Sequence, residues 1–143
     1  MAWSLVTPGT KGPLTVPEKA RLSAEILALY GRARWLLRRA DLPTALADLR
    51  DAPAADPPDG DQLAVGRALG EITSRTLSAL PTDGRCLIRS LVLTGLLSRR
   101  GIHSRLVLAV HPGESLAAHA WIEFDGAALL EPGRPPLERL AEL

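Results

Sequence analysis

Residues 84–102, GRCLIRSLVLTGLLSRRGI, decide the fold. They hold the one cysteine of the chain, Cys86, three residues after Asp83, which is a good helix cap. Apolar residues then recur at helical spacing as far as a pair of arginines that suits the helix dipole. Gly101 can close the helix in the left-handed conformation. We therefore predict a helix that carries Cys86 in its first turn.

After Gly101 the pattern changes from helical to alternating, which is typical of strands. Residues 102–110 (IHSRLVLAV), 118–124 (AHAWIEF) and 127–131 (AALLE) predict strands, and Asp125-Gly126 between the last two is a hairpin signal. The expected sheet is small and antiparallel. Because the helices come first and the strands follow, the fold class indicated is α+β.

Three helices are predicted before the cysteine helix. The first covers residues 18–39, a short second one lies in 43–50 with Pro43 near its start, and the third covers 62–80 and ends before Pro81. The Pro- and Asp-rich residues 51–61 indicate a linker or loop. The apolar face expected for the first helix is Leu22, Ile26, Leu29, Ala33 and Leu36, and that of the third is Leu63, Leu69, Ile72, Thr76 and Leu80.

Composition excludes several classes of function. The 143 residues suit one domain, and 17 basic against 16 acidic residues give a net charge of +1, so nucleic acid and anionic membranes are not expected partners. One cysteine cannot form an internal disulfide, and the start lacks a secretory signal, so we expect a cytoplasmic protein. No apolar run approaches the ~20 residues of a membrane helix.

Cys86 is the first candidate for chemistry. A thiolate attacks carbonyl carbon, and the unpaired N–H groups and positive dipole end of a helix start favour the thiolate and can donate to an oxyanion. Gln62, the one glutamine of the chain, is a candidate for the second oxyanion donor. The alternative is that Cys86 is a small buried residue without a chemical role, as many free cysteines are.

His119 is the candidate base, on the strand face that it shares with Trp121 and Glu123. The chain has no asparagine, so an acid would have to orient the imidazole. A two-residue hairpin loop would place Glu131 opposite Ala120 and facing away, whereas a three-residue loop, residues 124–126, would place it opposite His119. We predict the three-residue loop and Glu131 as the orienting acid. The alternatives are a structural histidine and an ordinary solvated acid.

Other polar residues give weaker signals. His103 and His111 lie on one face of the preceding strand, but their spacing matches no metal site, so no metal is expected. Arg89, one turn beyond Cys86, is a surface charge or a cation that favours thiolate. The first helix gathers a basic cluster around a tryptophan, and this face is either solvated or a surface for an acidic peptide or partner. Its residues are Arg32, Arg34, Trp35, Arg38 and Arg39.

The segments RCLIRSLVLTGLLSRRGI, LVLAV, AHAWIEFDG and LLEPG, in this order, resemble the transglutaminase-like cysteine peptidases that remove leader peptides in lasso-peptide biosynthesis. The resemblance covers about residues 60 to 133. It implies a papain- or transglutaminase-like fold, in which a cysteine-bearing helix packs on a small antiparallel sheet. It also implies Cys86 as nucleophile, His119 as base and Glu131 as third member, where the family often has aspartate.

The resemblance further implies the organisation and partners of the chain. Residues 1–59 would be an N-terminal helical segment that contacts leader or partner, and residues 60–143 the catalytic core; Trp121 is a further speculative contact for substrate. The expected partners are a precursor peptide, a small leader-recognition protein and an ATP-dependent lasso cyclase, with no cofactor. Two rivals stay open, namely acyl transfer to an amine by the same triad and a non-catalytic binding module.

Overall fold

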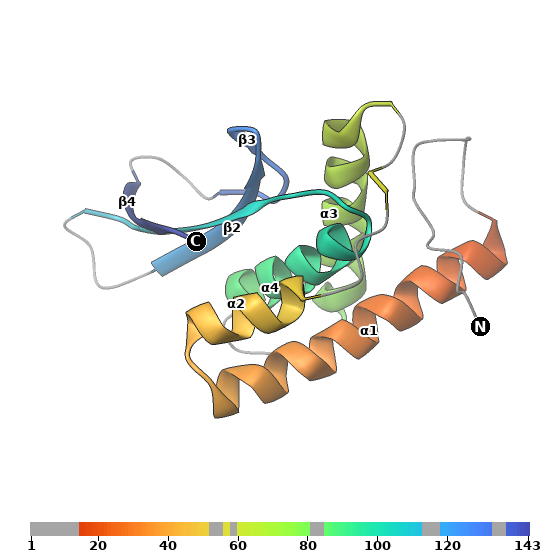
Figure 1. Cartoon of the computed structure of the whole chain (residues 1–143), viewed down its shortest axis with the longest axis horizontal. Coiled ribbons are helices and arrows are strands. Elements are labelled where there is room, and N and C mark those ends of the chain that lie inside the picture. The colour runs from red at the N-terminus through yellow and green to blue at the C-terminus, as the bar shows by residue number, and fades with distance from the viewer. Residues whose placement is uncertain (1–14, 52–55, 58–59, 81–84, 113–117, 133–136) are drawn as a thin grey trace.

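The computed structural model describes residues 15–51, 56–57, 60–80, 85–112, 118–132 and 137–143 (Figure 1). Along these residues four helices precede four strands, so the predicted α+β class is confirmed. The elements are α1 (Val16–Arg39), α2 (Leu42–Arg50), α3 (Gln62–Ser78), α4 (Arg85–Arg99), β1 (Arg105–Val110), β2 (Ala118–Phe124), β3 (Ala127–Ala128) and β4 (Glu138–Glu142). Asp83 and Pro81, the predicted cap and helix stop, and most of the predicted linker lie outside the described residues.

The first two helices begin one or two residues before their predicted starts, each next to a capping residue. Thr15 caps α1 through a capping box, in which its hydroxyl accepts from the Glu18 N–H and the Glu18 carboxylate accepts from the Thr15 N–H at 3.0 Å. Asp41 caps α2 by accepting from the Thr44 N–H at 2.8 Å, and Pro43 lies in the first turn. The predicted apolar face of α1 is confirmed, because all five of its residues are buried.

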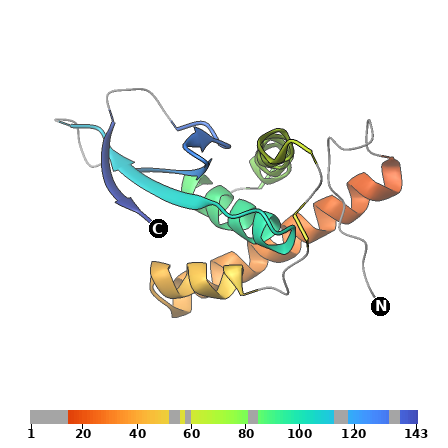
Figure 2. The same cartoon turned by 45° about the horizontal axis from the view of Figure 1, so that its top comes forward.

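The cysteine helix α4 is the centre of the fold. It packs against α1, α2, α3 and β2, and in Figures 1 and 2 it lies between the sheet and the first two helices. Residues 90–97 are all buried, which explains the nearly continuous apolar run. A Cβ on Gly95 would lie 2.8 Å from the Cδ2 atom of Leu29, so glycine lets α1 approach closely. Gly101, with φ of +72°, ends the helix as predicted.

One buried ion pair ties the end of α4 to α1. The Arg100 side chain is 1% exposed, and its guanidinium donates to both carboxylate oxygens of Glu25, at 3.0 and 2.9 Å. It also donates to the Leu96 carbonyl at 2.9 Å. A buried charge is tolerated when it is paired and hydrogen-bonded in this way.

The sheet has the strand order β3-β2-β1-β4 and is antiparallel throughout. β2 covers the predicted residues, whereas β1 begins at Arg105 and is three residues shorter than predicted. Strand β4 was not predicted. Its residues are mostly exposed because it lies at the sheet edge, so the sequence ERLAE carries no apolar alternation that would reveal it.

The predicted three-residue hairpin loop is wrong. Asp125 and Gly126 have φ of +51° and +82°, as a two-residue type I′ turn requires, and Phe124 pairs with Ala127. The ladder ends at Ala128, so the strand predicted over 127–131 is also too long. The Asp-Gly pair tolerates positive φ and therefore forms the short turn. The longer loop had been predicted because it would have placed Glu131 opposite His119.

After β3 the chain turns onto α3, at a part of the helix that the sequence did not predict. Of the predicted apolar face, Leu69 is buried, and Leu63, Ile72 and Leu80 are partly buried and pack against the main core. The fully buried residues are Val65, Gly66, Leu69, Gly70, Thr73 and Leu77. A Cβ on Gly70 would lie 2.2 Å from the Leu129 carbonyl oxygen, and one on Gly66 would meet the Leu129 side chain at 3.0 Å. A pattern of large apolar residues misses a face on which two glycines make the contact.

The described helices share one main core with the sheet. Buried residues of α1 and α2 belong to the same apolar cluster as those of α3, α4, β1 and β2. The helices on both sides of the predicted boundary at residues 59 and 60 therefore pack together. Among the described residues, no helix has the length and apolar character needed to cross a membrane.

Candidate active site

Cys86 is the second residue of α4 and is half-buried. Its N–H is one of the first four of the helix, which have no partner within the helix itself. Its side chain packs at the border of the main core, and its carbonyl accepts from the Ser90 hydroxyl at 2.7 Å. Cys86 as a whole is thus partly exposed and lies at the border of the core, which is compatible with a nucleophile at a helix start.

The starts of α4 and β2 lie at the same end of the molecule. β1 runs back along α4 after the reversal at Gly101, and β2 is antiparallel to β1, so α4 and β2 both begin on the left in Figures 1 and 2. His119 is the second residue of β2, as Cys86 is of α4. The topology therefore brings these two predicted site residues to the same end of the helix–sheet layer.

The two side chains belong to different layers at that end. Ala120 and Ile122 of β2 lie in the main core, on which α4 packs. Successive residues of a strand point to opposite faces, so His119 belongs with Trp121 to the face turned away from α4. Among the described residues, no hydrogen bond joins Cys86 and His119. A reaction between them would have to take place around the end of β2.

His111 contacts His119, which the sequence analysis did not anticipate. The ring centroids lie 4.9 Å apart at an interplanar angle of 90°, in an edge-to-face arrangement. Ala109 is the cross-strand partner of His119, and His111 lies two residues further on the same face. The signal was present in the sequence, because both histidines follow the alternation of neighbouring strands, but the pairing register was needed to read it.

The hairpin register does not place Glu131 opposite His119, as the predicted role of an orienting acid assumed. With the two-residue loop, Glu131 would fall opposite Ala120 if the ladder continued, and the ladder ends at Ala128. Glu131 is exposed, and no hydrogen bond or ion pair joins it to His119 among the described residues. Its role as orienting acid therefore stays a prediction that the family resemblance alone carries.

Two further residues near the predicted site have different surroundings. Gln62 is the first residue of α3, at the end of that helix opposite to the one that leads into α4. Its role as an oxyanion donor stays a prediction. Arg89, one turn after Cys86, is half-buried, and its Nε atom is buried without a hydrogen-bond partner in the described structure. Arg89 is therefore not an ordinary solvated surface charge.

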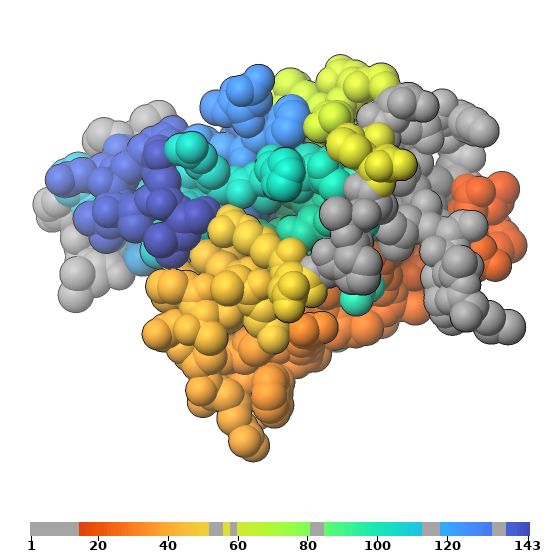
Figure 3. Space-filling view, viewed as in Figure 1, coloured from red at the N-terminus to blue at the C-terminus, as the bar shows by residue number. Residues whose placement is uncertain are grey.

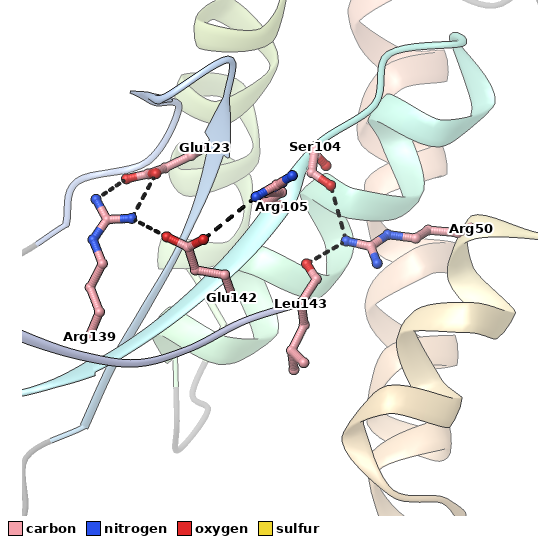
Figure 4. Close-up of polar contacts among 7 residues, drawn as sticks. All are labelled: Arg50, Ser104, Arg105, Glu123, Arg139, Glu142 and Leu143. Carbon is pink, nitrogen blue, oxygen red and sulfur yellow. Dashed lines mark hydrogen bonds and ion pairs between the residues drawn. The ribbon is translucent and has the colours of Figure 1, made fainter.

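Glu123, a carboxylate on the same face as His119, is engaged elsewhere. It accepts from the Trp121 indole at 2.9 Å and from both terminal nitrogens of Arg139 at 3.1 and 2.9 Å (Figure 4). Burial tends to raise the pKa of Glu123, but the hydrogen bonds from Arg139 and Trp121, together with the Arg139 charge, outweigh it and hold this pKa below its ordinary value. Glu123 thus holds Trp121 and β4 in place.

Further charged groups lie on and around β4, at the end of the sheet away from His119. Arg139 also binds Glu142, and Glu142 lies 3.6 Å from Arg105 (Figure 4). Arg50 of α2 donates to the carbonyls of Ser104 and Leu143 at 3.1 and 2.9 Å. These groups line or border a cleft of about 650 Å³ at the end of β1 where Arg105 lies. The cleft lies at the other end of the strands from His119.

The predicted basic cluster lies on the exposed side of α1. Trp35 is 56% exposed, the Arg39 guanidinium lies 5.5 Å from its ring centroid, and Arg32 binds Asp48 of α2. Arg34 and Arg38 are also exposed. Trp121, the other predicted contact residue, is instead 3% exposed and packs on Val107 and Ala109. It therefore offers little surface to a substrate in this conformation.

Comparison with family models identifies the fold. A model described as the transglutaminase-like superfamily matches residues 26–143, which include α2, α3, α4 and all four strands. The chain belongs to the transglutaminase-like superfamily. Members of this superfamily are commonly cysteine-dependent enzymes. The comparison with curated proteins gave no match, and neither did the comparison with solved structures. Within the described residues, no three histidine, cysteine, aspartate or glutamate side chains gather where a metal ion could bind.

Proposed function

We propose that this transglutaminase-like protein is a cysteine peptidase that removes the leader from a lasso-peptide precursor. The observation that carries the proposal is the position of Cys86, the one cysteine of the chain, half-buried in the first turn of the central helix. Membership of the superfamily supports it, because members of this superfamily are commonly cysteine-dependent enzymes. The sequence resemblance contributes the substrate class.

The proposed reaction uses the residues at the starts of α4 and β2. The Cys86 thiolate attacks the carbonyl carbon at the end of the leader, and the new C–S bond forms as the carbonyl oxygen takes the negative charge. His119 gives its proton to the leaving amine as the C–N bond breaks. Water then attacks the thioester, His119 accepts the proton, and the leader leaves with a carboxylate while the thiol is restored.

Backbone and side-chain groups would assist these steps. The N–H of Cys86, which has no partner within the helix itself, would donate to the oxyanion together with other first-turn amides of α4. Glu131 is the proposed orienting acid, and Gln62 a proposed second donor. The expected partners are the precursor peptide, a small leader-recognition protein and an ATP-dependent cyclase that acts on the released core. Residues 1–59 would contact leader or partner.

Alkylation of Cys86 tests the proposal without knowledge of the precursor. Because the chain has one cysteine, the mass increase after iodoacetamide treatment reports on that thiol alone. At pH 6 we expect labelling at least ~10-fold faster in the folded protein than in the urea-unfolded chain, because the proposed reaction requires a sulfur that is both nucleophilic and reachable. Slower labelling in the folded protein would show an inert, structural cysteine.

Cleavage is the second test. Purified protein should cut a lasso precursor at the leader–core junction, with the leader-recognition protein added in a parallel reaction. Cys86→Ala should abolish the cut while leaving the thermal unfolding curve unchanged, and Cys86→Ser is the matched conservative variant. Retained cleavage by Cys86→Ala would end the proposal. A product joined to an added primary amine would instead indicate acyl transfer.

A further inference from the structure

The outer side of α1 carries a stripe of residues with no role in the core. Ala24, Leu27, Gly31 and Trp35 recur at spacings of three and four, opposite the buried face of the helix. Leu27 is 45% and Trp35 56% exposed. We call this surface the outer stripe; its six exposed members are Ala20, Ala24, Leu27, Ala28, Gly31 and Trp35. In Figures 1 and 3, α1 lies along the lower border of the molecule, on the side away from the sheet.

The shape of the outer stripe suits another helix. Its middle is made of small residues, and a Cβ on Gly31 would have no atom within 4 Å, so this part of the helix surface is open. Leu27 and Trp35 project beside the small residues. Small residues between larger ones let two helix backbones approach closely. From Ala20 to Trp35 the stripe is ~22 Å long, which is about four helical turns.

Both rims of the outer stripe are basic. Helical spacing places Arg34 along one rim and Arg21, Arg32 and Arg39 along the other, and it places Arg38 at the end of the stripe, one turn beyond Trp35. All five arginines are exposed, and Arg32 is the one with an acidic partner in the described structure. The two acids of α1 are occupied elsewhere, because Glu18 completes the capping box and Glu25 binds Arg100. In a chain with a net charge of +1, this face is therefore strongly and locally positive.

We propose that the outer stripe docks an acidic amphipathic helix about four turns long, supplied by a partner. Small and apolar residues of the partner would face Ala24, Ala28 and Gly31, and its carboxylates would meet the arginines on both rims. A second copy of α1 does not fit, because it would set arginines against arginines. An anionic membrane fits less well, because alanine and glycine bury little apolar area. This docking is independent of the chemistry of Cys86.

The test uses two matched synthetic helices of about 18 residues, with alanine and leucine on one face and either glutamate or lysine on both flanks. Each is labelled and titrated with the full chain while fluorescence anisotropy is measured. The acidic peptide should bind and the basic one should not, and the affinity should fall as salt rises. Cys86→Ala should bind the acidic peptide as the unchanged protein does, which separates this proposal from the peptidase proposal.

Variants place the binding on the outer stripe. Gly31→Leu fills the open surface in the middle of the outer stripe without disturbing the core. Trp35→Ala removes the largest exposed side chain of the stripe. Each variant should weaken binding of the acidic peptide ~10-fold or more. The double variant Arg34→Glu and Arg38→Glu should lose the acidic peptide. The control, Arg67→Glu and Arg75→Glu on α3, changes the net charge equally and should bind almost as before.

Three results would overturn the proposal. One is that the acidic and the basic peptide bind equally well, or that neither peptide binds at concentrations of about 1 mM. Another is sedimentation with phosphatidylglycerol vesicles that depends on Trp35, without peptide binding, which would assign the stripe to membranes. The third is a concentration-dependent dimer in analytical ultracentrifugation that Gly31→Leu abolishes, which would assign it to self-association.

Discussion

The two faces of the sheet are built differently. The face toward α4 carries Leu106, Ala120 and Ile122, all buried in the main core. The other face carries a small apolar patch of Val107, Ala109 and Trp121, bordered by charged residues and by two histidines in contact. The first face supplies most of the stability, and the second carries most of the groups capable of chemistry. The candidate nucleophile lies on the first side and the candidate base on the second, so their reaction depends on the end of the sheet where the two sides meet.

The largest expected effect is on the helix-facing side. Ile122 is fully buried among side chains of the main core, so Ile122→Ala should lower the free energy of unfolding by about 2–5 kcal/mol. Trp121→Phe on the other face keeps most of the apolar volume and loses one hydrogen bond to Glu123, so it should cost about 1 kcal/mol. Urea unfolding of both variants measures the difference. Equal costs would show that the two faces contribute alike.

The contact between the chain after β3 and helix α3 gives the next largest expected effect on stability. Gly70→Ala would press a methyl group against the Leu129 carbonyl and should cost about 1–3 kcal/mol. Gly31→Ala, in open space on α1, should instead stabilise the protein by about 0.5–1 kcal/mol through helix propensity. Thermal unfolding of the pair checks this. A neutral Gly70→Ala would mean that the chain after β3 does not lie on α3 as described.

These two glycines also show what the sequence could and could not predict. Helices α1 and α4 and strand β2 follow from apolar periodicity, because each of them buries large side chains at regular spacing, and α2 follows from Pro43 near its start. The contact face of α3 and the edge strand β4 leave no such pattern, since one uses glycine and the other is exposed. The site residues Cys86 and His119 could be found by type and position. The His111 contact could not, because it depends on the register between β1 and β2.

The hydrogen bonds of Glu123, on the sheet face turned away from α4, should make the stability of the protein depend on pH. The folded-state pKa of Glu123 lies below its ordinary value of about 4.3, so its stabilising effect is complete above that value and is lost as pH falls through the folded pKa. The free energy of unfolding should therefore decrease below about pH 4.5 more steeply in the unchanged protein than in Glu123→Gln. Urea titrations between about pH 3 and 6 measure both slopes. Identical slopes would show that the carboxylate contributes nothing.

The smallest and most specific effect concerns the histidine pair. If His119 acts as the base for Cys86, the His111 ring restricts its orientation through the 4.9 Å edge-to-face contact. His111→Ala should then slow alkylation and cleavage several-fold with little change in KM, whereas His111→Phe, which keeps an aromatic ring at the same place, should restore much of the rate. His103→Ala, at the far end of β1, is the matched control. Because both His111 variants lose the imidazole, rescue by phenylalanine separates a positioning ring from a proton-transferring one. If His111→Phe were as slow as His111→Ala, the ring contact would not be what matters, and the hydrogen-bonding nitrogens of the His111 ring would become the next groups to test.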